Sequence, residues 1–374
     1  MFAEQNPSGL EVEHILADAS VRGSRIVQRV RERLPRASFQ VIGPEDPMPR
    51  FPAEDKVLYC KDYRGSFLRW CPGTSRYRCC GYRIVHIGES CPLSCSYCIL
   101  QAYFQDRLLK VWANEEDLFR ELAAHFSRGP GERFRVGTGE FTDSLALEAV
   151  TGYSSDLVGF LARFPNVCLE LKTKVADLSW VDAVRRPDRV LPAWSLNAPE
   201  VVASQERRTA SLEKRLRAAG ECARLGFRVC LHFDPIIAYP GWEQGYSRVI
   251  ESIFDHLRPR DIAYLSLGSF RCMPQLKELI AARWPDASYI HEEMVSGLDG
   301  KLRLLRPKRI RQLRFVADRL KRFGLGKEIY LCMESDEVWR AALGWTPRDL
   351  GGLQRHLLEL AFQSPRSREA FLCT

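Results

Sequence analysis

The stretch Cys91-Pro92-Leu93-Ser94-Cys95-Ser96-Tyr97-Cys98 determines how the rest of the chain is interpreted. It follows an apolar, strand-like run at residues 82–87. Three thiolates on one tight loop can hold three irons of a [4Fe–4S] cluster, which normally takes one cysteine at each iron, and leave the fourth iron open. We therefore predict that Cys91, Cys95 and Cys98 bind a [4Fe–4S] cluster.

An open iron has a specific use in radical chemistry. It can chelate the amino and carboxylate groups of S-adenosylmethionine, and an electron from the cluster then cleaves the sulfonium to give a 5′-deoxyadenosyl radical. The CxxxCxxC spacing resembles the signature of the radical S-adenosylmethionine superfamily. The alternatives are a zinc knuckle and ordinary buried thiols. Zinc sites favour two ligand pairs, and no second pair with zinc-site spacing follows Cys98, which favours the cluster.

Composition limits the class of protein. The 374 residues are enough for one large domain or two average ones, and an apolar fraction of 45% allows a buried core. Thirteen cysteines without a recognisable secretory signal favour a reducing, cytoplasmic location. No stretch reaches the length of a membrane span, so we expect no membrane partner. The net charge of +8 permits a polyanionic partner, and the oligomeric state is not indicated.

From Tyr82 onward, strand and helix patterns alternate. Six strands separated by helices predict parallel βαβ units and an α/β fold, a partial (β/α)6 barrel with its site at the C-terminal ends of the strands. The expected strands are residues 84–87, 134–136, 167–172, 190–195, 228–233 and 262–267, with helices near 115–127, 145–163, 209–225, 244–257 and 273–283.

The barrel is expected at residues 82–285, between two smaller regions. Residues 1–50 predict a small N-terminal α/β region with a helix at 21–34 and a strand at 39–42. A cluster of prolines predicts that residues 51–81 form a cysteine-containing linker. Residues 286–374 predict a C-terminal extension with a basic helix within 301–323, a strand at 329–332 and a terminal helix near 349–361.

Several motifs resemble the spore photoproduct lyase family of radical enzymes. They are Cys98-Ile99-Leu100-Gln101-Ala102-Tyr103-Phe104, Leu171-Lys172-Thr173-Lys174, Ser195-Leu196-Asn197, Leu212-Glu213-Lys214-Arg215 and Pro240-Gly241-Trp242-Glu243-Gln244-Gly245-Tyr246. The resemblance implies a partial (β/α)6 barrel, a [4Fe–4S] cluster and S-adenosylmethionine. It also implies a thymine–thymine lesion in DNA as substrate and an external one-electron reductant.

The resemblance and the residue types together indicate the cofactor site. Lys174 and Ser195 match residues that contact S-adenosylmethionine, and Tyr97 is expected near its adenine or the cluster. The stretch 137–140 resembles a strand-end motif for the methionine end of the cofactor; the alternative is a plain turn capped by Asp143 or Ser144. Asp234 could bind the ribose or substrate, or cap a turn. The predicted cofactor residues are Tyr97, Gly139, Glu140, Asp143, Ser144, Lys174, Ser195, Asn197 and Asp234.

The chain departs from the lyase pattern where the last hydrogen is transferred. Lyases have a cysteine donor after the second barrel strand, and here that position falls at Thr138 or Phe141. Ile99 also replaces a tyrosine of the family. We predict Cys332 as a candidate donor, for which the alternative is an ordinary core cysteine, with Tyr97 as a second catalytic candidate. The remaining upstream thiols could form a second cluster or metal site, supply a replacement donor, or simply be buried; they are Cys60, Cys71, Cys79 and Cys80.

The basic stretch at 301–323 suggests a surface for phosphates. We predict that Arg303, Arg306 and Arg309 hold the backbone of a nucleic acid, whereas the alternative is a solvated charged helix. The sequence therefore predicts a radical enzyme acting on a nucleic-acid lesion of the spore-photoproduct type. The alternatives are a radical enzyme acting on a peptide, metabolite or RNA base, and a non-catalytic iron–sulfur protein that binds nucleic acid or senses redox state.

Overall fold

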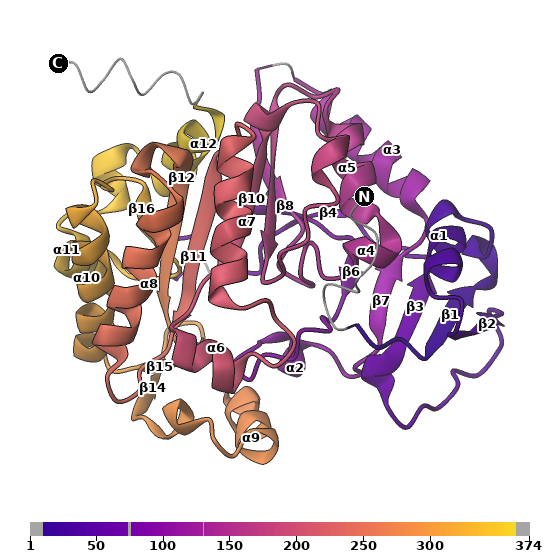
Figure 1. Ribbon diagram of the computed structural model, residues 1–374, viewed down its shortest axis with the longest axis horizontal. Coiled ribbons are helices and arrows are strands. Elements are labelled where there is room, and N and C mark those ends of the chain that lie inside the picture. The colour runs from indigo at the N-terminus through magenta and orange to yellow at the C-terminus, as the bar shows by residue number, and fades with distance from the viewer. Residues whose placement is uncertain (1–9, 74–75, 130, 364–374) are drawn as a thin grey trace.

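The computed structural model describes residues 10–73, 76–129 and 131–363, which are built around a curled sheet of eight strands (Figure 1). The strand order is β16-β12-β11-β10-β9-β8-β5-β4, and every neighbouring pair is parallel except β4 with β5. The six predicted strands are confirmed, and β16 and β4 extend the half-barrel at its edges. The bounds are β4 Leu68–Trp70, β5 Arg83–Val85, β8 Phe134–Gly137, β9 Val167–Thr173, β10 Val190–Ser195, β11 Val229–Ile236, β12 Ile262–Ser269 and β16 Ile329–Leu331.

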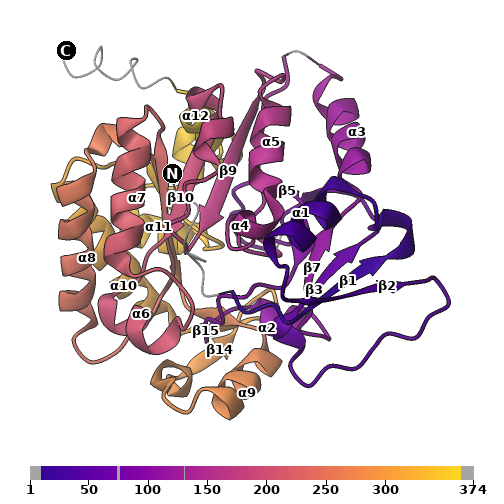
Figure 2. The same ribbon diagram turned by 45° about the vertical axis from the view of Figure 1, so that its right-hand side comes forward.

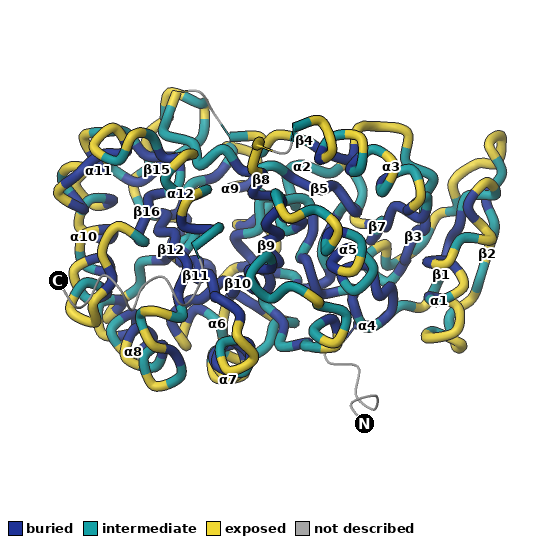
Figure 3. The backbone as a smooth tube through the Cα atoms, turned by 90° about the horizontal axis from the view of Figure 1, so that it is seen from above, coloured by how far each residue is buried: buried dark blue, intermediate teal, exposed yellow. Residues whose placement is uncertain are grey.

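Helices cover the outer face of this sheet. Strands β10 and β12 are buried along their whole length, as expected for parallel strands packed beneath crossover helices. Figure 3 shows these buried strands inside a ring of helices whose outer faces are exposed. The covering helices are α5 Tyr153–Leu161, α7 Leu212–Arg224, α8 Trp242–His256, α10 Arg306–Arg322 and α12 Leu353–Phe362. The other crossover helices are α3 Glu115–Phe126, α4 Glu148–Thr151 and α6 Pro199–Gln205.

The N-terminal part forms a separate five-stranded sheet beside the barrel (Figure 2). Its order is β2-β1-β3-β7-β6, with helix α1 Arg25–Arg33 joining the first two strands. The predicted linker at 51–81 is therefore wrong, because it contributes β3 here and β4 to the barrel. The sheet also takes β7 from the chain beyond the cysteine loop, and such distant pairing leaves no local pattern. The strands are β1 His14–Asp18, β2 Ser38–Ile42, β3 Val57–Lys61, β6 Gly88–Glu89 and β7 Leu109–Trp112.

The C-terminal part adds an edge strand to the half-barrel and does not stand apart from it. Strand β16 pairs with β12, so the barrel extends beyond the predicted boundary at residue 285. A small antiparallel sheet has the order β13-β15-β14. Its strands are β13 Arg271–Cys272, β14 Met294–Ser296 and β15 Leu302–Leu304, and helices α9 Pro274–Arg283 and α11 Asp336–Leu343 complete the region. Within the described residues, no helix combines the length and apolarity needed to cross a bilayer.

A buried ion pair fixes the loop that carries residues 91–98. Arg215, fully buried, bonds to Glu206 and donates to the carbonyl oxygens of Ala210 (2.8 Å) and Ser195 (2.9 Å). Burial on its own would raise the pKa of Glu206, but the Arg215 guanidinium brings it below its ordinary value. Glu206 in turn accepts the phenol of Tyr97 and forms an isolated antiparallel bridge with Cys95.

Removing the Arg215 side chain should destabilise the whole fold. Arg215→Ala leaves the Glu206 carboxylate buried without its cation, which costs about 3–5 kcal/mol. Arg217 on the same helix bonds to Glu213 at the surface, so Arg217→Ala should destabilise the fold far less. Urea denaturation measures the free energy of unfolding of both variants. An equal loss of this free energy in the two variants would contradict the anchoring role of Arg215.

Candidate active site

The curled sheet and its loops enclose a cavity of about 640 Å³. It lies at the C-terminal ends of the barrel strands, where a site was expected. Its walls come from the cysteine loop, the helix α2 Leu100–Tyr103, the ends of β9 to β12, and the segments around residues 71–82 and 330–333. Regions far apart in the sequence therefore meet around a single space.

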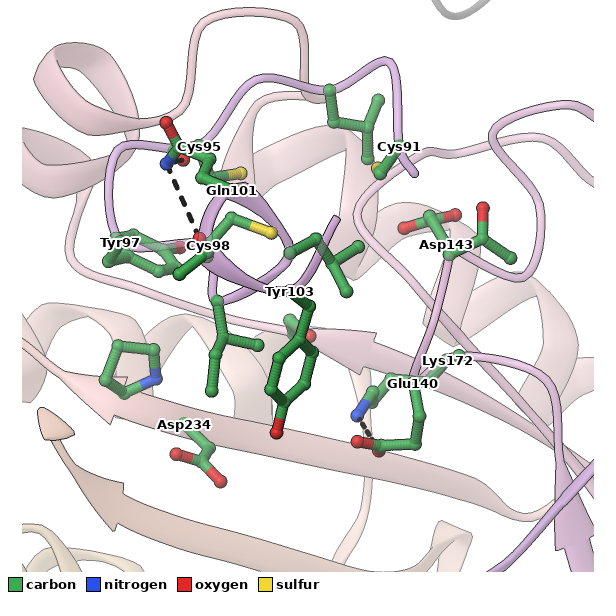
Figure 4. Close-up of a pocket in the computed structure, with 18 of the residues that line it drawn as sticks. Cys91, Cys95, Tyr97, Cys98, Gln101, Tyr103, Glu140, Asp143, Lys172 and Asp234 are labelled. Atoms are coloured by element: carbon green, nitrogen blue, oxygen red, sulfur yellow. Dashed lines mark hydrogen bonds and ion pairs between the residues drawn. The ribbon is translucent and has the colours of Figure 1, made fainter. Parts of the chain in front are cut away.

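The three cysteines of the loop all line this cavity. Figure 4 shows the sulfur atoms of Cys91, Cys95 and Cys98 grouped at one end of it. The loop is held from within by Gln101, whose amide donates to the carbonyl oxygens of Cys95 (3.1 Å) and Ser96 (2.9 Å). Burial raises the pKa of each of the three thiols.

The arrangement of these thiols fits a polynuclear cluster. Among the described residues, no three cysteine, histidine, aspartate or glutamate side chains converge on one point as the ligands of a single ion would. Three thiols that face a common space from separate positions suit a [4Fe–4S] cluster, because each cysteine takes its own iron. The donor set that lines the cavity therefore fits the predicted cluster.

The turn after β8 supplies Gly139 and Glu140 to the cavity. A side chain at Gly139 would collide with Lys172, since a Cβ there would lie 2.8 Å from the lysine Cβ and 3.0 Å from its carbonyl oxygen. Glu140 forms an ion pair with Lys172 (2.6 Å), marked in Figure 4. Both residues line the cavity, where the charge of Glu140 is already matched by a lysine, and their cofactor role stays a prediction.

Asp143 and Ser144 hold this turn together. The carboxylate of Asp143 accepts hydrogen bonds from the backbone of Leu145 (3.0 Å) and Ala146 (2.9 Å), and also from the hydroxyl of Thr173 and the backbone N–H of Lys174. Ser144 is buried, and its hydroxyl accepts one from Thr138. Asp143 also lines the cavity, so its cofactor role stays a prediction, whereas Ser144 is not among the described residues that line it.

Both lysines of the Leu171-Lys172-Thr173-Lys174 motif face the cavity. Side chains two positions apart on a strand point to the same side, which is why both could be predicted from the sequence. The Lys174 ammonium lies 5.6 Å from the centre of the Tyr97 ring and acts on the charges of Cys95 and Glu206. Lys174 therefore brings a positive charge next to the cysteine loop.

Ser195, Asn197 and Asp234 come from the ends of β10 and β11. Ser195 and Asp234 line the cavity, and both terminal nitrogen atoms of the Arg271 guanidinium contact the Asp234 carboxylate, at 3.1 and 3.2 Å. Asn197 is buried and bonds to the carbonyl oxygen of Pro235 and to Tyr246. Its predicted cofactor role is corrected, since its amide holds the chain after β11.

Thiols outside the loop also reach the cavity. Cys332, at the end of β16, lines it and accepts a hydrogen bond from Arg271 (3.3 Å). Cys71 and Cys80 line the same space. Cys60, by contrast, is buried in β3 of the N-terminal sheet, so it does not join the other cysteines in a second metal site.

The predicted substrate arginines do not face the cavity. Arg303 is buried and pairs with Asp299 (2.8 Å), and Arg309 is buried against Glu334 (2.9 Å). Arg306 is exposed and pairs with Glu337. The role predicted for Arg303 and Arg309 is wrong, because buried guanidinium groups that hold the C-terminal region together cannot contact phosphates.

A group of polar residues that the sequence analysis missed forms part of the cavity floor. Glu170, His232 and Ser266 lie on β9, β11 and β12. His232 bonds to the Ser266 hydroxyl (2.7 Å) and lies 3.3 Å from Glu170. Burial alone would raise the pKa of Glu170, but His232 and other partners lower it to about 2. The signal in the sequence was a charged or ionisable residue inside an otherwise apolar strand.

Comparison with known proteins agrees with this architecture. The family model of spore photoproduct lyase matches residues 78–296, more than half of the chain. A similar protein is the spore photoproduct lyase of Clostridium acetobutylicum, which is 21% identical over 54% of this chain and 60% of that protein. The spore photoproduct lyase of Geobacillus sp. is 23% identical over 68% of this chain and 70% of that protein. The match thus spans about three fifths of the first relative's length.

Solved structures give the same result for the fold. A spore photoproduct lyase mutant with bound AdoMet and dinucleoside spore photoproduct superposes with a TM-score of 0.75, at 16% identity, over 87% of this chain and 99% of that chain. A spore photoproduct lyase complexed with dinucleoside spore photoproduct superposes with a TM-score of 0.74, over 86% of this chain and 98% of that chain. The predicted radical S-adenosylmethionine barrel is confirmed, and the chain belongs to the spore photoproduct lyase family.

Proposed function

We propose that the protein is a radical S-adenosylmethionine enzyme that repairs a thymine lesion of the spore-photoproduct type in DNA. The observation that carries the proposal is the group of three thiols facing a cavity of about 640 Å³ at the C-terminal ends of the strands. Membership of the family supports the substrate class. When bound, the [4Fe–4S] cluster and S-adenosylmethionine supply a 5′-deoxyadenosyl radical, once an external reductant has given one electron.

The chain's own residues would position the cofactor. Cys91, Cys95 and Cys98 are the ligands of the cluster. Lys174 offers a cation to the carboxylate of S-adenosylmethionine, and Ser195 offers a hydroxyl at the end of the next strand. Tyr97 forms part of the wall beside them, and its hydrogen bond to Glu206 keeps its ring in place.

Cys332 is the proposed source of the hydrogen that returns to the product. Neither Thr138 nor Phe141 is among the described residues that line the cavity, whereas the Cys332 thiol is. Burial raises the pKa of Cys332 well above that of an ordinary thiol, and the Asp234 carboxylate raises it further. The thiol therefore keeps its S–H bond at neutral pH, which a hydrogen-atom donor requires.

The cluster assignment can be tested on one cysteine. Cys95→Ala should lose most of the iron and all cleavage of S-adenosylmethionine, because one iron lacks its ligand. Cys222→Ala is the matched control, since Cys222 is buried in α7 away from the cavity. Iron and sulfide analysis of anaerobically reconstituted protein, with release of 5′-deoxyadenosine, measures the effect. Full cleavage by the Cys95 variant would exclude the assignment.

The donor role separates cofactor use from product formation. With dithionite and a dinucleotide containing the spore photoproduct, the unaltered protein should restore thymines. Cys332→Ala should still consume S-adenosylmethionine but yield products other than thymine, as measured by mass spectrometry. Cys272→Ala is the control, because Cys272 is buried and lies outside the described cavity lining. Normal repair by the Cys332 variant would contradict the donor role.

Arginines at the edge of the cavity are the proposed contacts for the DNA backbone. Arg107 and Arg283 both line the cavity, and the Arg107 side chain is 53% exposed. Arg208 lies beside them, 3.5 Å from the same Asp55 that Arg107 approaches at 3.6 Å. Arginine forks suit phosphate oxygens. These residues would hold a strand next to the cavity, where the C-terminal arginines do not reach.

Salt dependence distinguishes the two basic surfaces. Arg107→Ala combined with Arg283→Ala should weaken binding of a thymine-rich single strand. It should also lower the slope of log affinity against log salt by about 1.4, because each phosphate that an arginine no longer neutralises lowers it by about 0.7. Arg306→Ala, on α10, should change neither quantity. Fluorescence anisotropy at several salt concentrations gives both, and a larger effect of Arg306→Ala would move the proposed DNA-binding surface to the C-terminal helix.

A further inference from the structure

Two thiols on one side of the cavity belong to segments that are joined to each other. Cys332 follows β16, and Cys80 precedes β5, and both line the cavity. The backbone N–H of Arg78 donates to the carbonyl oxygen of Glu334 (3.1 Å). The Arg78 side chain also bonds to Asp336 (2.6 Å). The segment that carries Cys80 is thus bound to the segment that carries Cys332.

These bonds hold the two thiol-bearing segments side by side. The backbone bond lies two residues before Cys80 and two residues after Cys332. The charge of Cys80 acts on Cys332, so the two thiols lie within electrostatic reach of each other in the same cavity. A second connection reinforces this arrangement, since Arg303 donates to the carbonyl oxygen of Met333 (3.1 Å) and stacks on the ring of Tyr77 (4.1 Å).

The two thiols have different chemical surroundings. A hydrogen bond from Cys79, with the charge of Arg135, lowers the pKa of Cys80 to about 6, although burial opposes this. Burial and the Asp234 carboxylate raise the pKa of Cys332. The charge of Cys80 also raises the pKa of Cys332, and its effect is larger than the effect of Cys71. One thiol is therefore ready to react as a thiolate, while the other keeps its proton.

We propose that Cys80 and Cys332 are a redox-active pair that closes to a disulfide across the cavity wall. The Cys80 thiolate attacks glutathione disulfide and releases one glutathione thiolate. Cys332, after losing its proton to water, displaces the second glutathione and forms the Cys80–Cys332 bond. Two protein thiols are oxidised and one glutathione disulfide is reduced to two glutathiones, so atoms and electrons balance.

The pair has a consequence for repair that rests on the proposed function. In the disulfide, Cys332 has no S–H bond and cannot return a hydrogen to the product. The oxidised enzyme would still consume S-adenosylmethionine but would not complete repair, and a dithiol reductant would restore it. The redox state of the cell would then decide whether the cavity contains a donor.

Peptide mapping tests the disulfide without any need for a substrate. The anaerobic holoenzyme is equilibrated with glutathione buffers of increasing disulfide content, its free thiols are blocked, and it is digested with trypsin. Trypsin places Cys79 and Cys80 on residues 79–83, Cys332 on 328–340 and Cys71 on 70–76. We expect the first two peptides to become linked as the disulfide content rises, while the iron content stays constant.

Matched variants identify the sulfur that reacts. Cys80→Ser should abolish the link and Cys79→Ser should retain it, although the two cysteines are neighbours on one peptide. A link from residues 79–83 to 70–76, or none in the most oxidising buffer at constant iron content, would overturn the proposal. Because the readout is a covalent bond, a failed repair assay would count against the proposed function and leave the thiol pair standing.

Discussion

The buried pair of Glu206 and Arg215 is the interaction on which the site depends. The cysteine loop has little regular structure of its own, and its position comes from neighbours that this pair holds. Glu206 bridges to Cys95 and accepts the phenol of Tyr97, while Arg215 reaches the carbonyl oxygen at the end of β10. A buried ion pair cannot lose one member without leaving a costly charge, so the loop cannot move freely. The three thiols are therefore placed before any cluster binds.

The same rule explains the remaining charges in the cavity. Glu140 is paired with Lys172, Asp234 with Arg271, and Glu170 with Arg135, because an isolated charge in such a space would be expensive. Lys174 differs, since its ammonium lies beside the ring of Tyr97. A carboxylate that arrives with S-adenosylmethionine would meet a cation there without breaking an existing pair. The cavity is thus balanced internally and keeps one positive charge close to the cysteine loop.

The sequence predicted what local patterns encode and missed what distant contacts decide. The barrel strands are apolar runs, and the spacing of Lys172 and Lys174 defines one strand face, so both were predictable. The N-terminal sheet was not predictable, because β3 and β7 are separated along the chain by two barrel strands, β4 and β5, and by the cysteine loop. Asp143 and Asn197 have residue types suitable for binding, but backbone groups from other segments already use them.

The position of the proposed donor along the curled sheet matters for the direction of hydrogen transfer. The family's donor position lies after β8, whereas Cys332 ends β16, and four strands stand between β8 and β16 in the sheet. If Cys332 is the donor, the hydrogen atom reaches the substrate from the β16 edge of the sheet and not from the side of β8. The reacting carbon would then face the wall formed by β16 and the segment of Cys80. A lesion bound in this cavity would therefore sit with its product radical turned toward that wall, where Arg271 also holds Asp234 and the Cys332 thiol in one group.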